Sequence, residues 1–245
     1  MKHDEYAIMY RVEDSHWWYH GLRGMLSEHW QKYMKFDSPR ILDAGCGTGA
    51  VLEMFATKAQ TVGIDFASEA LEFCRLRGLS HLGRASIADL PFADAAFDAV
   101  VSCDVLCHQS IPNKQATLTE IARTVKPGGL LFLNLPAYQW LMSSHDTHVL
   151  TNKRFSRSEV VRMLDVAGCD TLRSTYWNTC LFPPVLLTRL WRKIRPLPTS
   201  DLDGASGESL TSIFRTVLSV ERACARLIDL PFGLSIFVVA QKRNA

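Results

Sequence analysis

The clearest chemistry in this sequence belongs to an apolar segment that ends in an acid and is followed by three alternating glycines. Residues 41–49 read Ile-Leu-Asp-Ala-Gly-Cys-Gly-Thr-Gly, so Asp43 stands between a strand-like pair and a tight turn. Glycine is needed where the backbone takes positive φ or approaches a ligand closely. The turn would present the first amides of the next helix to a ligand. Because Asp43 would repel a pyrophosphate and hold an amine, we expect a ligand that is cationic at one end.

A second acid follows at the spacing of a neighbouring strand. Residues 60–66 form another apolar segment that ends in Asp65, 22 positions after Asp43. At the tip of the adjacent parallel strand, Asp65 would accept hydrogen bonds from both hydroxyls of a ribose. The alternative is a helix-capping acid, since Ser68 and Glu69 follow directly.

The glycine spacing by itself also fits another class of cofactor. Gly45, Gly47 and Ala50 match G-x-G-x-x-G/A, so a nicotinamide or flavin dinucleotide is a competing interpretation. The sequence further along distinguishes the two. Ala-Ser-Ile-Ala-Asp-Leu-Pro-Phe at 85–92 precedes a fourth strand at 97–104, and Lys-Pro-Gly-Gly at 126–129 introduces a fifth at 130–135.

With these segments the sequence resembles the class I S-adenosylmethionine-dependent methyltransferases, in particular the bacterial small-molecule group with an LDxGCGTG signature. The resemblance covers about residues 38–180 and a last strand near 233–241. It implies S-adenosylmethionine as cofactor, with the 43–49 turn around its methionine part. Asp65 would hold the ribose, and Asp89 with the amide of Leu90 would read the adenine edge, unless Asp89 is only an exposed loop acid. The implied cofactor-binding residues are Asp43, Ala44, Gly45, Gly47, Gly49, Asp65, Phe66, Asp89, Leu90 and Cys103.

The alternation of strand-like and helix-like segments predicts an α/β fold with a doubly wound, Rossmann-like sheet and helices on both faces. The resemblance implies seven strands, of which the sixth is at 169–177 and the last, antiparallel, at 235–240. The predicted units are an N-terminal helical cover at 1–37, a cofactor-binding domain at 38–180 and 231–245, and a helical insertion or lid at 181–230.

The cover and the insertion each allow two interpretations. The aromatic residues at 16–19 either fix the following helix to the domain or fold over the cofactor mouth. The insertion predicts two helices, 181–194 and 210–228, around a polar loop at 196–207. The basic residues of its first helix are compatible with a membrane surface. Packing on the domain or on a second subunit explains the same pattern, and we expect packing.

Three further groups would lie at the carboxyl ends of the strands, where ligands bind in doubly wound sheets. His108 is either a general base near neutral pH or a polar wall of the pocket. Cys107 replaces a glutamate that accompanies this histidine in relatives, some of which use the pair around a metal, so we predict no metal. Tyr138 lines the pocket or packs beneath it. The segment 144–156 resembles an HD…RRY segment of related enzymes and suggests a substrate clamp.

These groups give the candidate residues on the substrate side. The predicted catalytic residues are His108, His145 and Asp146, and the predicted pocket residues are Trp17, Tyr19, Tyr138, His148 and Arg154.

Composition limits the partners. The formal charge is +2, from 27 basic and 25 acidic residues, which gives no basic field for nucleic acid. The apolar run at 130–135 is too short to cross a bilayer, and residues 1–6 do not resemble a signal peptide. The seven cysteines form no C-x-x-C pair. We expect a cytoplasmic monomer or homodimer with a small-molecule acceptor and at most peripheral membrane contact.

The sequence therefore predicts an S-adenosylmethionine-dependent methyltransferase of a small metabolite, with a biosynthetic role. One alternative is an enzyme that uses the same cofactor for aminocarboxypropyl transfer or cyclisation. The other is a non-catalytic scaffold protein that keeps the cofactor site.

Overall fold

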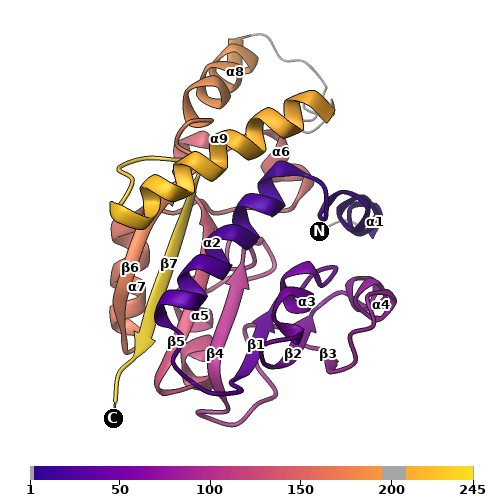
Figure 1. The fold of residues 1–245 in the computed structure, drawn as a ribbon, viewed down its shortest axis with the longest axis vertical. Helices are drawn as coiled ribbons and strands as arrows, with labels where there is room; N and C mark the ends of the chain where they lie inside the picture. The colour runs from indigo at the N-terminus through magenta and orange to yellow at the C-terminus, as the bar shows by residue number, and fades with distance from the viewer. Residues whose placement is uncertain (1–2, 195–207, 245) are drawn as a thin grey trace.

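A seven-stranded sheet with the order β3-β2-β1-β4-β5-β7-β6 forms the centre of the molecule. The computed structural model describes residues 3–194 and 208–244. The strands are β1 (Arg40–Ala44), β2 (Gln60–Asp65), β3 (Leu82–Arg84), β4 (Phe97–Cys103), β5 (Val125–Pro136), β6 (Cys169–Trp177) and β7 (Ser235–Lys242). Neighbours from β3 to β5 pair in parallel, whereas β7 is antiparallel to both β5 and β6. This confirms the predicted fold class, including the antiparallel last strand (Figure 1).

Helices cover both faces of the sheet and rise beyond the edge where β1, β2 and β4 end (Figure 1). They are α1 (His3–Val12), α2 (Trp17–Tyr33), α3 (Ala50–Ala56), α4 (Ser68–Leu76), α5 (Lys114–Thr124), the 3-10 helix η1 (Gln139–Leu141), α6 (Ser144–His148), α7 (Arg157–Val166), α8 (Phe182–Ile194) and α9 (Glu208–Leu227). No helix in the described part of the chain is long and apolar enough to cross a membrane. The predicted loop at 196–207 lies outside the described residues.

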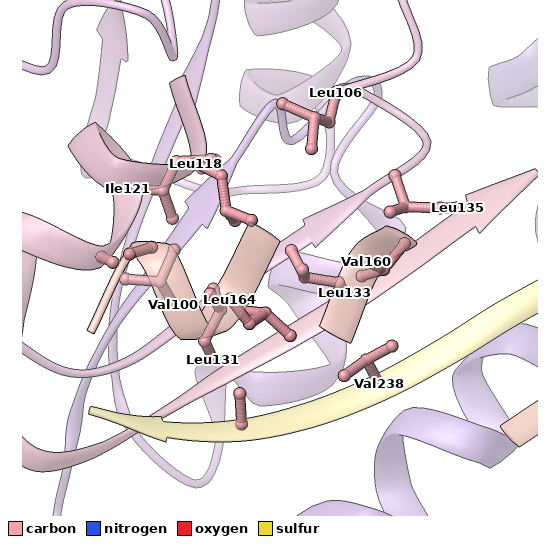
Figure 2. Packing of buried hydrophobic residues seen from close by; sticks show 14 of the residues in the cluster. Val100, Leu106, Leu118, Ile121, Leu131, Leu133, Leu135, Val160, Leu164 and Val238 are labelled. Carbon is pink, nitrogen blue, oxygen red and sulfur yellow. The ribbon is translucent and has the colours of Figure 1, made fainter. Parts of the chain in front are cut away.

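One face of the sheet is closed by α5 and α7. Figure 2 shows Leu118 and Ile121 of α5 and Val160 and Leu164 of α7 packed with apolar side chains of the central strands. The strand residues in this contact include Val100, Leu131, Leu133 and Val238. Since these positions are at most 1% exposed, their apolar surface is removed from water almost completely.

The opposite face is closed by α2. Its side chains Leu22, Met25, Leu26 and Trp30 pack on Ile41, Val101, Phe132 and Phe237. The helix α9 lies outside α2, and Phe214 of α9 contacts the ring of Trp17 at a centroid distance of 5.4 Å. The segment 1–37 predicted as a cover thus includes α2, which packs on one face of the sheet, and its role as a cover of the cofactor remains a prediction.

Sequence signals fix where several helices begin. Ser156 and Glu159 form the expected capping box at the start of α7, each side chain bonding the backbone of the other. At α3 the N-cap is Gly49, with φ 93° and ψ 4°. This left-handed conformation is unfavourable for residues with a Cβ, so the third glycine of the turn is needed for the helix to start there.

One buried and one exposed residue in the last turn of α7 provide a test of this packing. Leu164→Ala should lower the free energy of unfolding by about 2–5 kcal/mol, because it leaves a cavity at a fully buried position. Val166→Ala on the same helix removes a side chain that is 68% exposed and should change stability by less than about 0.5 kcal/mol. Urea unfolding measures both values. Equal losses would contradict the assignment of the core face of α7.

Candidate active site

The end of β1 buries a carboxylate with one oxygen that lacks a partner. Asp43 is 3% exposed, and its Oδ2 atom has no hydrogen-bond partner among the described residues. Burial first, and then the nearby Asp65 and Glu13, raise the pKa of Asp43 to about 8. A buried acid that accepts no bond is costly unless a ligand supplies the missing donor. A cationic amine supplies both the donor and the opposite charge.

The glycine turn places this acid next to the ligand-binding edge. The amides of Gly45 and Cys46 both donate to the carbonyl oxygen of Ile64, at 2.9 Å each, so the turn is tied to β2. Gly45 has φ 91°, and a Cβ at this position would lie 2.3 Å from Cγ2 of Val105. The backbone therefore passes close to the exit of β4, which only glycine permits.

Asp65 at the end of β2 is fixed by backbone amides. Its Oδ2 accepts from Gly47 and its Oδ1 from Ala67, both at 3.0 Å. Burial raises the pKa of Asp65, and the two amides oppose that effect. The side chain of Tyr6 also hydrogen-bonds to this carboxylate at the end of β2.

The helix α1 lies over the same turn. Glu13, just beyond α1, is 1% exposed and accepts a hydrogen bond from Thr48 of the glycine turn. Arg77 donates to Glu13 at 2.8 Å and to Asp14 at 3.0 Å. The ring of Tyr10 stacks on Phe73 of α4 at 4.9 Å. Burial, followed by the charge of Asp65, raises the pKa of Tyr6, which shows that α1 reaches the second acid.

The loop after β3 carries the two residues predicted to read adenine. The amide of Leu90 donates to Glu120 Oε1 at 2.9 Å in this structure, and its role toward adenine remains a prediction. Asp89 is exposed beside it, and its assignment remains a prediction. Phe66 is 67% exposed at the end of β2, with the Arg84 guanidinium carbon 5.8 Å from the centre of its ring.

A third acid, Asp104, was not predicted as a site residue. It directly follows β4 and has φ 56°, a conformation that is uncommon outside glycine. Its Oδ2 accepts from Asn134 Nδ2 at 2.7 Å, and Asn134 Oδ1 in turn accepts from Trp177 Nε1 at 2.8 Å. This chain crosses from β6 through β5 to the end of β4. A strained non-glycine residue held by a buried network is a feature of functional sites.

The surroundings of Asp104 leave it near neutrality. Burial raises its pKa to about 7, although the bond from Asn134 and the charge of Arg154 act in the opposite direction. The charges of Asp43 and Asp104 add to the effect of burial in raising the pKa of Cys103, so this cysteine lies near both acids. Tyr19 is near Asp104 and Glu13, whose charges help to raise the pKa of its buried hydroxyl. Tyr19 therefore lies near Asp104, and its role in a substrate pocket remains a prediction.

His108 is a weaker base than expected. Burial first, with the nearby Lys114 charge, lowers the pKa of His108 to about 4. Its Nδ1 lies 2.7 Å from Ser110 Oγ. The thiol of Cys107 donates to the Asp104 carbonyl oxygen at 3.1 Å, and burial raises the pKa of this thiol to about 12. Within the described residues, no group of three or more His, Cys, Asp or Glu side chains could hold a metal ion.

The predicted substrate clamp is an internal ion pair. Asp146 is 2% exposed and accepts from Arg154 Nε at 2.8 Å and from the Ser143 amide at 2.8 Å. Arg154 is 6% exposed and also donates to the carbonyl oxygen of Ala137 at 3.1 Å. Both side chains are occupied in holding α6 against the end of β5. In this structure the two charges are paired with each other, and the predicted catalytic role of Asp146 and pocket role of Arg154 remain predictions.

The remaining predicted residues differ in position. His148 is exposed, its Nδ1 lies 2.8 Å from the Ser144 carbonyl oxygen, and its pocket role remains a prediction. His145 lies within α6, and its side chain is outside the described part of the structure. Trp17 packs between α2 and α9, whereas Tyr138 stacks on Tyr176 at 5.2 Å near the end of β5. Ala44 is fully buried, and its carbonyl oxygen accepts from Ser102 Oγ at 2.9 Å.

The sheet order, the glycine turn after β1 and the acids that end β1 and β2 define a protein that binds a nucleoside-containing cofactor with a cationic end. Comparison with known proteins agrees. Residues 42–133 match the family model described as "Methyltransferase domain". The chain is 33% identical over 166 residues to the ubiquinone biosynthesis O-methyltransferase of Idiomarina loihiensis, an alignment that covers 60% of this chain and 66% of that enzyme. It is also 32% identical over 135 residues to "Probable tRNA methyltransferase 9B" of Mus musculus, covering 55% of this chain and 28% of that protein.

Solved structures show the same fold. A methyltransferase bound to the Haloferax volcanii Trm112 activator matches with a TM-score of 0.63 and 18% identity, over 99% of this chain and 95% of that chain. A Galdieria sulphuraria protein described as a "putative sarcosine dimethylglycine methyltransferase" matches with a TM-score of 0.60 and 15% identity, over 91% of this chain and 85% of that chain. The chain belongs to the class I S-adenosylmethionine-dependent methyltransferases, and S-adenosylmethionine is its cofactor. The matched region is 28% of the length of the Mus musculus protein and 66% of the length of the Idiomarina loihiensis enzyme, so this chain matches only part of each curated relative.

Replacing Asp43 should have opposite effects on the stability of the ligand-free protein and on its affinity for S-adenosylhomocysteine. Its folded-state pKa of about 8 lies above the ordinary value of 3.8. The unfolded chain therefore releases this proton first, and the ligand-free protein loses stability as the pH rises from about 4 to about 8. Asp43→Asn should remove this part of the pH dependence and make the ligand-free protein more stable at pH 8. The same change should weaken S-adenosylhomocysteine binding by about 1–3 kcal/mol.

Urea unfolding at several pH values and titration calorimetry measure these two effects. The control is Asp37→Asn, which changes an exposed acid and should alter neither quantity. An Asp43→Asn variant that binds S-adenosylhomocysteine as tightly as the natural protein would rule out the role given to this carboxylate.

Proposed function

We propose that the protein transfers a methyl group to a small molecule with an acidic hydroxyl group, and that Asp104 is the general base. The position of Asp104 is the observation that supports this most directly. A carboxyl group with a pKa of about 7 ends the strand beside the cofactor turn, and a network that spans three strands fixes it there. A base with a pKa near the working pH is suited to proton transfer in the transition state.

The residues at the ends of β1 and β2 fit the cofactor. The unpartnered Asp43 oxygen would accept from its ammonium group, and Asp65 would accept from the ribose hydroxyls. When bound, S-adenosylmethionine supplies an electrophilic methyl group on a sulfonium centre. The charge of Asp43, and that of Asp65 at the neighbouring strand end, favour this cation electrostatically.

Asp104 would act on the acceptor through one oxygen. Asn134 engages Oδ2, and among the described residues no partner is present for Oδ1. Oδ1 is therefore the atom that takes the proton of the acceptor hydroxyl. Asn134 and Trp177 are positioning residues, since they hold the carboxyl plane fixed and do not reach the acceptor themselves. Tyr19, close to Asp104, would help to exclude water from the reacting groups.

The proposal of a small-molecule acceptor has two supports. The Idiomarina relative, aligned over 66% of its length, is named for the biosynthesis of ubiquinone, a small molecule. The chain also lacks the large excess of basic residues that binding to RNA uses, with 27 basic and 25 acidic residues. The mouse relative named as a tRNA methyltransferase makes RNA the alternative acceptor to test.

Asp104→Asn should lower kcat by about 10²–10⁴-fold towards a phenolic acceptor, with little change in S-adenosylhomocysteine affinity. In the natural protein, kcat/KM should rise with pH through about 7 as Asp104 loses its proton, and this limb should be absent in the variant. The control is His108→Asn, since a histidine with a pKa of about 4 cannot produce that limb. Unchanged turnover in Asp104→Asn would contradict the proposal.

The acceptor class can be identified by measuring methyl transfer from labelled cofactor. The acceptors tested are simple phenols, catechols and amines, with bulk tRNA in parallel. We expect product with the phenols or catechols. Label transferred to tRNA alone would contradict the small-molecule assignment.

A chelation experiment tests the prediction of metal independence. Turnover should be unchanged after exhaustive treatment with EDTA, because the thiol of Cys107 is buried with a pKa of about 12 beside His108. Loss of turnover that magnesium or zinc restores would show that the residues at the end of β4 form a metal site.

A further inference from the structure

A second cleft lies between α2, α3 and α9, where α9 crosses α2 (Figure 1). Its volume is about 440 Å³, which is within the range of pockets that bind small molecules. The acids at the strand ends, Asp43, Asp65 and Asp104, are not among the described residues that line it. The charged and polar part of its lining consists of Asp14, His20, Arg23, Gly24, Glu53 and Arg222.

Arg222 of α9 is a buried cation whose hydrogen bonds within the protein are long. Its side chain is only 16% exposed. Nη1 donates to the His20 carbonyl oxygen at 3.4 Å and Nη2 to Ser219 Oγ at 3.5 Å, whereas about 2.9 Å is usual for such bonds. Nε is buried and has no hydrogen-bond partner among the described residues. A guanidinium group in this state is costly unless a ligand accepts from its donors.

The carboxylate that Arg222 approaches also binds a second arginine. Glu28 Oε1 lies 3.5 Å from Arg222 Nε, but it accepts from Arg226 Nη2 at 2.8 Å. The shorter, charge-assisted bond is the stronger of the two, so Glu28 mainly compensates Arg226. Arg222 therefore keeps most of its charge for the cleft.

Gly24 of α2 makes room for this guanidinium group. A Cβ at position 24 would lie 1.8 Å from Arg222 Nη1 and 2.5 Å from its Cζ. Glycine within a helix is unfavourable relative to alanine, because its more flexible backbone must be ordered. The glycine is explained by the arginine side chain that it admits to the cleft.

Positive charge is concentrated on the side of the cleft formed by α2 and α9. Partial burial, and then the charges of three arginines, lower the pKa of His20. These arginines are Arg222, Arg215 and Arg23. Arg23 donates through Nη1 to the Glu13 carbonyl oxygen at 2.8 Å, and no carboxylate among the described residues pairs with it. Its other donors therefore remain available to an anion.

The side of the cleft near α3 carries two acids. Asp14 and Glu53 both accept from Arg77, at 3.0 Å and 2.7 Å, so Arg77 compensates part of their charge. Their side chains are 63% and 48% exposed, which leaves carboxylate lone pairs open to the cleft. The cleft thus presents anion-binding donors on one side and acceptors for hydroxyl groups on the other.

We propose that this cleft binds a phosphate monoester whose organic part carries hydroxyl groups, such as a phosphorylated sugar. Arg222 and Arg23 would bind the phosphate, because the planar guanidinium group donates to two oxygens of an anion at once. Asp14 and Glu53 would accept from the hydroxyl groups. This inference goes beyond the proposed function, because it assigns a second binding site that does not depend on the methyl acceptor.

Titration calorimetry with glucose 6-phosphate and glycerol 3-phosphate tests the proposal. Both esters should bind the natural protein, and Arg222→Gln should weaken binding about tenfold or more, because a charge-assisted pair is lost. Gly24→Ala should also weaken binding, since its methyl group would displace the Arg222 guanidinium without any change in charge. The control is Arg162→Gln on α7, which removes an exposed arginine on the opposite face of the sheet and should have no effect.

Two further measurements make the result decisive. Calorimetry of S-adenosylhomocysteine binding on all variants shows that they are folded and separates this cleft from the cofactor site. Inorganic phosphate and glucose should each bind more weakly than glucose 6-phosphate. The proposal is overturned if neither ester binds, if Arg222→Gln binds them as tightly as the natural protein, if Arg162→Gln loses as much affinity as Arg222→Gln, or if inorganic phosphate binds as tightly as the esters.

Discussion

The burial of acidic groups at one edge of a parallel sheet is the constraint on which this structure depends. Asp43, Asp65 and Asp104 all stand at strand ends, where the desolvation of a carboxylate raises its pKa. Each is accommodated differently. Asp65 is held by two amides, Asp104 by an amide side chain and Asp43 by no described partner for one of its oxygens. We therefore assign Asp65 to the ribose hydroxyls, Asp104 to proton transfer and Asp43 to the cationic end of the cofactor.

The rest of the fold can be understood as support for these positions. The glycine turn brings the backbone against Val105 and so places the ends of β1 and β4 close together. The ion pair of Asp146 and Arg154 fixes the segment after β5. The charge of Arg154 also offsets part of the rise in the pKa of Asp104 that burial causes. Trp177 lies at the end of β6, yet its indole orients the amide that holds Asp104. Residues far apart in the sequence thus determine the ionisation of one carboxyl group.

Part of the fold and part of the site could be predicted from the sequence, because they depend on residues that are neighbours along the chain. The acid and glycines of residues 43–49, the second acid at Asp65 and the capping box of α7 depend on neighbours along the chain, and the structure shows them as expected. Asp104 was missed because its importance comes from Asn134 and Trp177 on other strands. The ion pair of Asp146 with Arg154 could not be predicted for the same reason, since nothing in the local sequence of Asp146 indicates its partner. The hydrogen bond from the Leu90 amide to Glu120, 30 positions away, was likewise not visible in the local sequence.

The central claim is that Asp43 holds a proton in the free protein and gives it up to hold the cationic end of the cofactor. Titration calorimetry of S-adenosylhomocysteine binding at pH 7, repeated in buffers with different ionisation enthalpies, counts the protons released. With a pKa of about 8 in the free protein, Asp43 should contribute most of one proton to this release, and Asp43→Asn should abolish that contribution. Proton release that is zero, or that is the same in both proteins, would contradict this account of the site.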